Sequence, residues 1–271
     1  EIADFGVEEI NLGAPILGEE AQLSVTADAR LTDDVARLAF LAQRTDDKRG
    51  VFEISADYQR SEGILDLLLK LEEEEEGIAA RLLNIPDQPS VSLTVEGSGP
   101  VDALETQVVI ATDDTERLAG QIVLGTQTPR RASDTPDRRI QADIGGDITA
   151  LLAPRYREFF GEDVKLTIDA LLEGNGAIEV SSFALDTQAA KLAGRVNLNQ
   201  EKWPTFIDIE GVVENSDGTR VLLPVSGEAT TVQRAGLDVN YDAADGEAFD
   251  GRFDIQALET TGVKIEDTEL E

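Results

Sequence analysis

The chain has 271 residues, of which 41% are apolar and 29% charged, and it contains no Cys, His or Met. This composition is typical of a globular protein, and it excludes disulfides, thiolate–zinc sites and catalysis by Ser–His or Cys–His pairs. The 55 acidic and 23 basic residues give a net charge of −32, which disfavours binding to nucleic acid and to anionic membrane surfaces.

No targeting or membrane segment is evident in the sequence. Residues 1–10 have neither the basic start nor the apolar stretch of a signal peptide, and the longest apolar run, residues 64–69, is far too short to span a bilayer. The chain as given is therefore predicted to be soluble. The absence of an initiating Met indicates an excerpt from a longer or processed chain.

The dominant pattern is strict alternation of apolar and polar residues, which is typical of half-buried antiparallel strands. It predicts one strongly twisted antiparallel sheet with an apolar face. The residues expected to line this face are Leu65, Leu67, Leu69, Val91, Leu93, Val95, Ile122, Leu124, Ile168, Val196, Leu198, Val239 and Ile255.

Three segments carry helical signals. Thr32 precedes two aspartates and an apolar stripe that runs to Ala42, which predicts a capped amphipathic helix. Residues 77–84 predict two further helical turns. Asp147 begins a third amphipathic stretch, which Pro154 is expected to split. All three are expected to cover the sheet.

Two composition breaks suggest how the chain is organised. The five glutamates of residues 72–76 predict a solvated turn. Residues 127–139 are rich in Pro, Arg, Ser and Asp, and they predict a loop or linker between a first β segment, residues 1–126, and a second, residues 140–271.

The two halves also resemble each other. Residues 117–124 and 191–198 share a basic-Leu-Ala-Gly-x-apolar strand. Each follows an earlier strand and a predicted glycine turn, at Gly97 and Gly99 in the first half and at Gly174 and Gly176 in the second. Repetition of this kind favours a sheet that grows by adding hairpins.

Catalytic and metal-binding signals are weak. Carboxylates are so numerous that a pair of acidic residues does not identify a catalytic site. None of the acidic turns matches a calcium-binding loop. We therefore expect no catalytic residue, cofactor or metal, and the protein is predicted not to be an enzyme. Trp203, the only Trp, precedes a proline and is expected to pack in the core or at an edge.

Four segments resemble the TamB family, the translocation and assembly module subunits of alphaproteobacteria. These segments are residues 77–102 (GIAARLLNIPDQPSVSLTVEGSGPVD), 116–124 (ERLAGQIVL), 139–169 with GGDITALLAPRYREFFGEDVKLTID, and 191–204 (KLAGRVNLNQEKWP). The resemblance runs from about residue 20 to the end. The family's N-terminal membrane anchor and C-terminal docking region are not visible in the chain.

The resemblance implies a long β-sheet curled into an open U-shaped groove, a β-taco, within a periplasmic bridge whose parent protein is anchored in the inner membrane. It implies phospholipid acyl chains as ligands, transport of phospholipids between the two membranes, and support of outer-membrane protein assembly. A TamA-like outer-membrane partner would bind through other parts of the parent chain.

Two alternatives remain open. One is a chaperone that offers edge strands to unfolded outer-membrane proteins by β-augmentation. The other is an acidic extracellular β-solenoid with a closed core.

Overall fold

The computed structural model describes residues 2–14, 19–127, 135–225, 227–246 and 249–270. The chain divides into two compact units, Glu1–Gly125 and Thr126–Glu271, and each is described here by itself. The boundary lies at the start of the expected linker, whose residues 128–134 fall outside the described residues.

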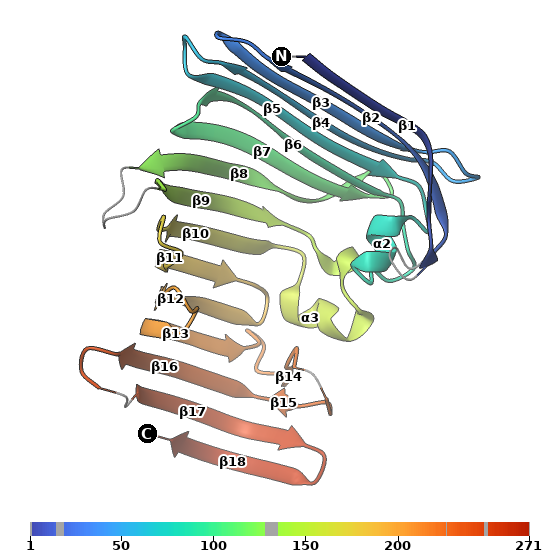
Figure 1. The fold of residues 1–271 in the computed structure, drawn as a ribbon. Coiled ribbons are helices and arrows are strands. Elements are labelled where there is room, and N and C mark those ends of the chain that lie inside the picture. Colours follow the sequence, from blue (N-terminus) through green and yellow to red (C-terminus); the bar gives the residue numbers. More distant parts are fainter. Residues whose placement is uncertain (1, 15–18, 128–134, 226, 247–248, 271) are drawn as a thin grey trace. The chain divides into compact units, whose positions relative to one another are not determined.

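The first unit is a meander in which strands that follow one another in the chain pair with one another (Figure 1). Its strands are β1 (Ile2–Leu12), β2 (Ala21–Leu31), β3 (Val35–Arg44), β4 (Gly50–Gln59), β5 (Ile64–Glu73), β6 (Val91–Pro100), β7 (Ala103–Thr112) and β8 (Thr115–Gln127). The short helix α2 (Ile78–Leu82) connects β5 to β6.

The second unit is also a meander, interrupted by one small hairpin between β13 and β16. Its strands are β9 (Asp137–Gly146), β10 (Val164–Leu172), β11 (Ile178–Asp186), β12 (Ala190–Leu198), β13 (Pro204–Glu214), β14 (Val221–Leu222), β15 (Thr231–Val232), β16 (Arg234–Asp242), β17 (Phe249–Thr260) and β18 (Val263–Leu270). Three short helices connect β9 to β10: η1 (Thr149–Leu151), η2 (Pro154–Tyr156) and α3 (Arg157–Phe160).

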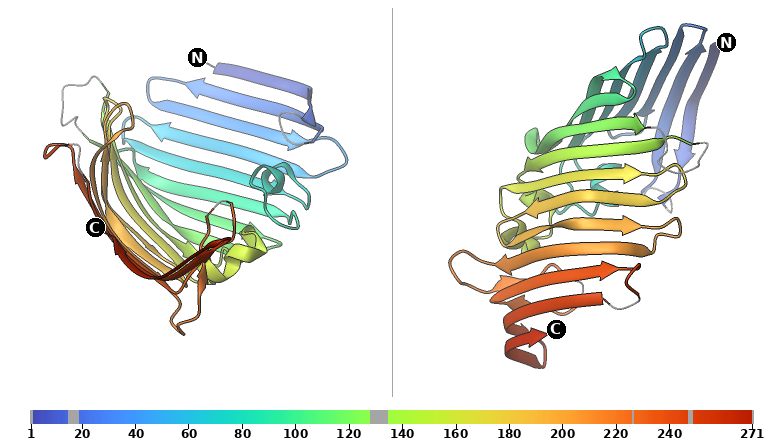
Figure 2. Two further views of the ribbon diagram at one scale, coloured as in Figure 1. Left: turned by 90° about the horizontal axis from the view of Figure 1, so that it is seen from below. Right: turned by 90° about the vertical axis from the view of Figure 1, so that its left-hand side faces the viewer.

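The predicted fold class is confirmed. The protein is mostly β, with 65% of residues in strands and 6% in helices, and every strand pairing is antiparallel. Among the described residues, no pairing joins β1 to β8 or β9 to β18, so neither sheet closes on itself. Figure 2 shows that both sheets are twisted.

The prediction of a helix after Thr32 is wrong, because this segment forms the turn into β3. The Thr32 hydroxyl accepts a hydrogen bond from the Val35 amide at 3.0 Å, and the Thr32 amide donates to the Val35 carbonyl at 2.9 Å. The side chain that could cap a helix therefore closes a hairpin instead. After this turn, the apolar residues Leu38, Phe40 and Ala42 recur every second position, as in a strand. Pairing with β2 and β4 provides hydrogen-bond partners for the backbone N–H and C=O groups of β3.

The other two helical predictions are confirmed. Helix α2 lies within the expected residues 77–84, and its Ala80 is fully buried. In the second unit Asp147 accepts a hydrogen bond from the Thr149 amide at 2.9 Å, and Pro154 begins a separate helical turn. The glutamate run is only partly a turn, because β5 extends to Glu73, whose carboxylate accepts a hydrogen bond from the Ala79 amide at 2.6 Å.

The glycines of the two half-repeats do not play the same part. Gly174 and Gly176 lie in the turn between β10 and β11, as expected, whereas Gly97 and Gly99 lie inside β6. A Cβ on Gly97 would be 2.3 Å from the Glu105 carbonyl oxygen, so this glycine permits a close approach of two strands rather than a turn. Gly194 in β12 is similar, with a Cβ position 2.4 Å from the Asp208 carbonyl oxygen.

We expect Gly194→Ala to lower the free energy of unfolding by about 1–3 kcal/mol, because the new methyl group must displace backbone of β13. Gly236→Ala in β16 is the matched control. Its Cβ would meet no atom closer than 3.6 Å, and we expect a change within about 0.5 kcal/mol. Denaturant titration followed by circular dichroism measures both, and equal effects would contradict the close-approach argument.

Candidate functional site

The first unit carries a continuous apolar face, here called the first apolar face, formed by alternate residues of β1–β8. Because paired residues of an antiparallel sheet point to the same side, the strand register defines this face. One of its rows runs across seven strands through Phe5, Ala27, Phe40, Ile54, Leu69, Val95 and Val108. The eight predicted residues of this unit, Leu65, Leu67, Leu69, Val91, Leu93, Val95, Ile122 and Leu124, all lie on it.

Most of the first apolar face is not packed against a second layer. Phe5 is 60% exposed and Leu31 is 48% exposed, while Leu67, Leu69 and most of their neighbours are only half-buried. The fully buried apolar residues of this face include Val91 at the start of β6 and Leu104 and Val108 in β7. Val91 therefore belongs to a packed part and is not available to a ligand, contrary to its predicted role.

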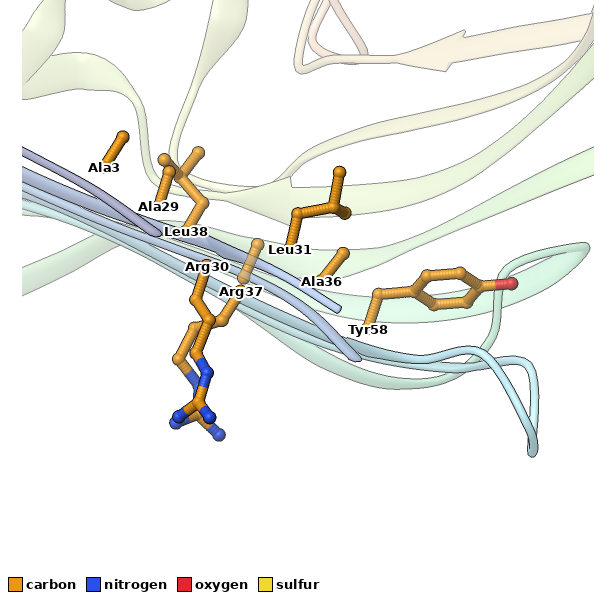
Figure 3. A pocket seen from close by; sticks show the side chains of 9 residues that line it. Ala3, Ala29, Arg30, Leu31, Ala36, Arg37, Leu38 and Tyr58 are labelled. Atoms are coloured by element: carbon orange, nitrogen blue, oxygen red, sulfur yellow. The ribbon is translucent and has the colours of Figure 1, made fainter. Parts of the chain in front are cut away.

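A shallow apolar hollow of about 470 Å³ lies on this face over β1–β4. Its floor consists of alanines, including Ala29, Ala36 and Ala56, and Leu31, Leu38 and Tyr58 stand around it. Figure 3 shows these apolar side chains rising from one side of the sheet, while the side chains of Arg30 and Arg37 extend from the other.

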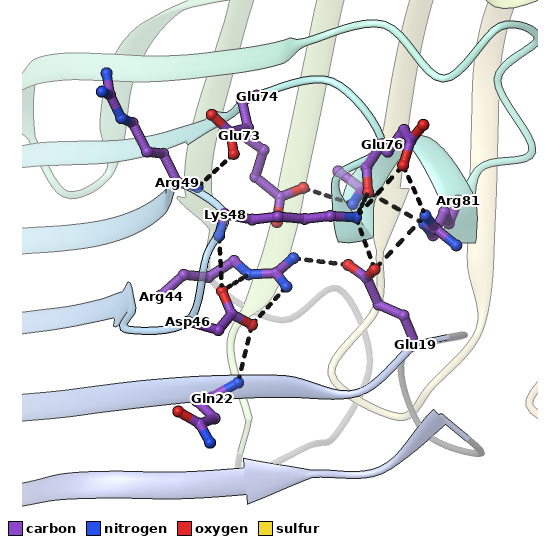
Figure 4. Close-up of polar contacts among 11 residues, drawn as sticks. Glu19, Gln22, Arg44, Asp46, Lys48, Arg49, Glu73, Glu74, Glu76 and Arg81 are labelled. Atoms are coloured by element: carbon purple, nitrogen blue, oxygen red, sulfur yellow. Dashed lines mark hydrogen bonds and ion pairs between the residues drawn. The ribbon is translucent and has the colours of Figure 1, made fainter.

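The first apolar face ends at a charged cluster beside α2 (Figure 4). Arg44 continues the apolar register of β3 opposite Leu23, yet its side chain is only 4% exposed. It contacts Asp46 through two nitrogens at 3.0 and 2.7 Å, and Glu19 at 2.7 Å. Lys48 joins the same Glu19 carboxylate at 2.8 Å and the carbonyl oxygen of Glu76 at 2.8 Å.

These contacts shift the pKa values of the acids in the cluster. The hydrogen bonds from Arg44 lower the pKa of Asp46 to about 2, against the opposing effect of its burial. Burial raises the pKa of Glu19, but hydrogen bonds from Lys48 and Arg44 outweigh it and leave the value lowered. Glu19 and Asp46 are thus ionised at neutral pH, and the cluster fastens the β1–β2 and β3–β4 connections to α2.

The second unit has an equivalent surface, the second apolar face, formed by alternate residues of β9–β13 and β16–β18. One row runs through Ala142, Ile168, Phe183, Gly194, Ile209 and Val239. The predicted residues Ile168, Val196, Leu198, Val239 and Ile255 all lie on this face. Ile168, Val196, Leu198 and Val239 are half-buried.

One end of the second apolar face is covered. Phe159 of α3 packs in a buried cluster with Ala189, Ala190, Val221 and Val232. Phe160, Leu223 and Ile255 pack against the same cluster, so the half-buried Ile255 lies at the edge of a small core. Helix α3 and the β14–β15 hairpin therefore cover this end of the second apolar face, while the residues in its middle are only half-buried.

The opposite face of each sheet is polar and carries cross-strand ion pairs. Arg37 pairs with Asp57 in the first unit, and Arg195 pairs with Asp208 in the second. Arg234 contacts both Glu214 at 3.1 Å and Asp254 at 2.8 Å. Such exposed pairs contribute little to stability, about 0–1 kcal/mol each, but they keep the two faces chemically distinct.

Three further observations concern expectations from the sequence. In the described part of the chain, no three acidic side chains converge as a metal site requires. No helix among the described residues is long and apolar enough to cross a membrane. Trp203 is 70% exposed in the turn between β12 and β13, so the prediction that it packs in the core or at an edge is wrong.

The buried cluster around Arg44 was not predicted from the sequence. One signal was available, since Arg44 extends the apolar alternation of Leu38, Phe40 and Ala42. A charge in an apolar register needs a partner. One partner, Asp46, lies two residues away in the sequence, but Glu19 lies 25 residues away and could not be identified from the sequence.

Comparison with known proteins gives no relative: no family model, curated protein or solved structure matches the chain.

We expect Asp46→Asn to lower the free energy of unfolding by roughly 1.5–3 kcal/mol at pH 7, because it removes charged hydrogen bonds from the buried Arg44. The Asp46 pKa is about 2 in the folded protein and near 3.8 in the unfolded chain. The stabilisation is therefore complete above pH 4 and is lost as the pH falls toward 2.

Denaturant titrations at several pH values between 7 and 2 test this expectation. The difference between wild type and Asp46→Asn should shrink below pH 4. Asp57→Asn, which breaks an exposed pair, is the control and should cost at most about 1 kcal/mol. A difference that does not depend on pH would rule out the ionised Asp46 as its source.

Proposed function

We propose that the protein is a non-enzymatic lipid-carrying scaffold that shields phospholipid acyl chains along its two apolar faces. The observation that carries the proposal is the openness of these faces: rows of apolar residues run across the strands, and most of their described side chains are only half-buried. Exposed apolar patches of this extent mark surfaces that bind other molecules.

The dimensions and energetics favour acyl chains. Eight strands about 4.8 Å apart span roughly 34 Å across the first sheet. A single acyl chain spans roughly 15 Å, half of a bilayer's hydrocarbon core, so two chains fit end to end along a row. Each methylene group removed from water contributes about 0.8 kcal/mol to the binding free energy, and this contribution needs no specific polar contact.

The biological setting is proposed from the resemblance to the TamB family. In this setting the segment belongs to a periplasmic bridge that moves phospholipids between inner and outer membrane and supports outer-membrane protein assembly. Contacts with a TamA-like partner and the membrane anchor would belong to other parts of the parent chain.

The β-augmentation chaperone remains a second candidate for one reason. Within the described residues, β1 pairs only with β2 and β18 pairs only with β17, so each has an edge that an extended polypeptide could join. The solenoid with a closed core has less support, because a closed core would bury the central rows that are here half-exposed.

A charge on the open face tests the proposal. We expect Leu93→Asp to fold and to keep its β circular-dichroism spectrum, because the carboxylate can reach water. It should weaken binding of a fluorescent fatty acid or of lysophosphatidylcholine at least about tenfold, because acyl chains would meet an ionised group. The Leu198→Asp variant makes the same test on the second apolar face.

The matched control is Thr94→Asp, which adds the same charge one residue away on the polar face, opposite Lys70. It should bind the probe as the wild type does. The proposal fails if Leu93→Asp binds normally. It also fails if Leu93→Asp unfolds with the loss of about 3–5 kcal/mol typical of a core substitution, since this would indicate a filled interior.

A further inference from the structure

The end of the second unit opposite α3 carries exposed aromatic residues. This end, here called the turn margin, consists of the turns at residues 173–177, 199–203 and 243–246 with the strand ends beside them. Trp203 is 70% exposed and Phe249 is 61% exposed, and Leu172 lies exposed in the same margin. Leu172 ends β10, Trp203 lies in the turn between β12 and β13, and Phe249 begins β17, so the three residues are spread along this margin.

The turn that carries Trp203 is held in place by its own hydrogen bonds. The Trp203 amide donates to the Asn199 side-chain oxygen at 2.9 Å, and the Trp203 carbonyl accepts from the Asn199 amide at 2.9 Å. The Lys202 ammonium donates to the Gly176 carbonyl oxygen at 2.6 Å and ties this turn to the next one. The indole is thus presented to solvent by a defined turn.

The two ends of the second apolar face differ in access. At the far end Phe159, Val221 and Val232 are buried in the small core, so an apolar chain on the face meets packed protein there. At the turn margin Ala170 and Ala177 are buried, but Leu198 is half-buried and the residues beyond it include the exposed Trp203 and Phe249. An amphiphile whose tail lies along the strands of this face therefore places its polar group at the turn margin.

The chemistry of the margin selects the kind of polar group. Tryptophan is favoured at the level of lipid headgroups, where its ring meets apolar atoms and its N–H meets polar ones. Its ring face also attracts quaternary ammonium groups. The turns add the exposed carboxylates of Glu201 and Asp245. Two cations lie nearby: Lys202 contacts a backbone carbonyl, and Arg138 is exposed opposite Leu172.

We propose that the turn margin docks on zwitterionic phospholipid surfaces, with Trp203 as the anchor at headgroup level and the carboxylates facing the choline or ethanolamine ammonium groups. The net charge of −32 also disfavours binding to anionic lipid surfaces, because like charges repel. The inference rests on the proposed function, because it takes the second apolar face as the place where the acyl chain lies.

Trp203 is the only tryptophan, so tryptophan fluorescence of the full chain reports this residue alone. We expect phosphatidylcholine vesicles to shift its emission to the blue, and phosphatidylcholine brominated near the headgroup end of its acyl chains to quench it. Phosphatidylglycerol vesicles should give a much weaker response. Unchanged emission with phosphatidylcholine, or an equal response to phosphatidylglycerol, would overturn the inference.

Variants separate this inference from the proposed function. Trp203→Ala should weaken cosedimentation with phosphatidylcholine vesicles about fivefold, as expected for one aromatic anchor, and should keep binding of monomeric lysophosphatidylcholine. Leu83→Ala, which truncates an equally exposed residue beside α2, is the control and should cosediment as the wild type does.

If Trp203→Ala cosediments normally while the lysolipid still binds, the docking inference is wrong and the proposed function stands. If the wild type binds no lysolipid, the proposed function fails first, and the docking inference fails with it.

Discussion

Alternation of apolar and polar residues along paired antiparallel strands places two chemically different surfaces back to back, and the apolar one must be kept from water. In most proteins a second layer covers such a face. Here the covering elements are small: α2 with its ion cluster in the first unit, and α3 with the β14–β15 hairpin in the second. Most described residues of each apolar face are therefore only half-buried.

The covered ends show how the protein limits this exposure. In the first unit the apolar register stops at Arg44, whose stem lies over Gly50 and whose guanidinium is neutralised by Asp46 and Glu19. A charge buried in this way is costly unless it is fully paired, so the cluster marks where the apolar surface ends. In the second unit a small core of aromatic and aliphatic residues covers one end of the apolar face by packing, without a cluster of charges among the described residues of that core.

The sequence predicted the faces well because the side-chain period of a strand is two, and a register error by one residue would have turned every side chain over. All thirteen predicted face residues lie on the apolar faces, although Val91 is fully buried there and Ile255 packs at the edge of a small core. The failures have physical causes. Residues 32–42 carry both a helical stripe and an alternation, and only the neighbouring strands decide between them. Gly97 resembles a turn glycine but serves a close approach between strands.

The central claim is that the open apolar face carries lipid, and photo-crosslinking in cells tests it most directly. A photoreactive side chain at Leu69 would lie in the middle of the first apolar face, and one at Lys70 would lie on the polar face of the same strand. The account predicts that Leu69 cross-links to phospholipid, identified by mass spectrometry, and that Lys70 does not. Cross-links from Leu69 to polypeptide alone, or lipid cross-links from both positions, would contradict it.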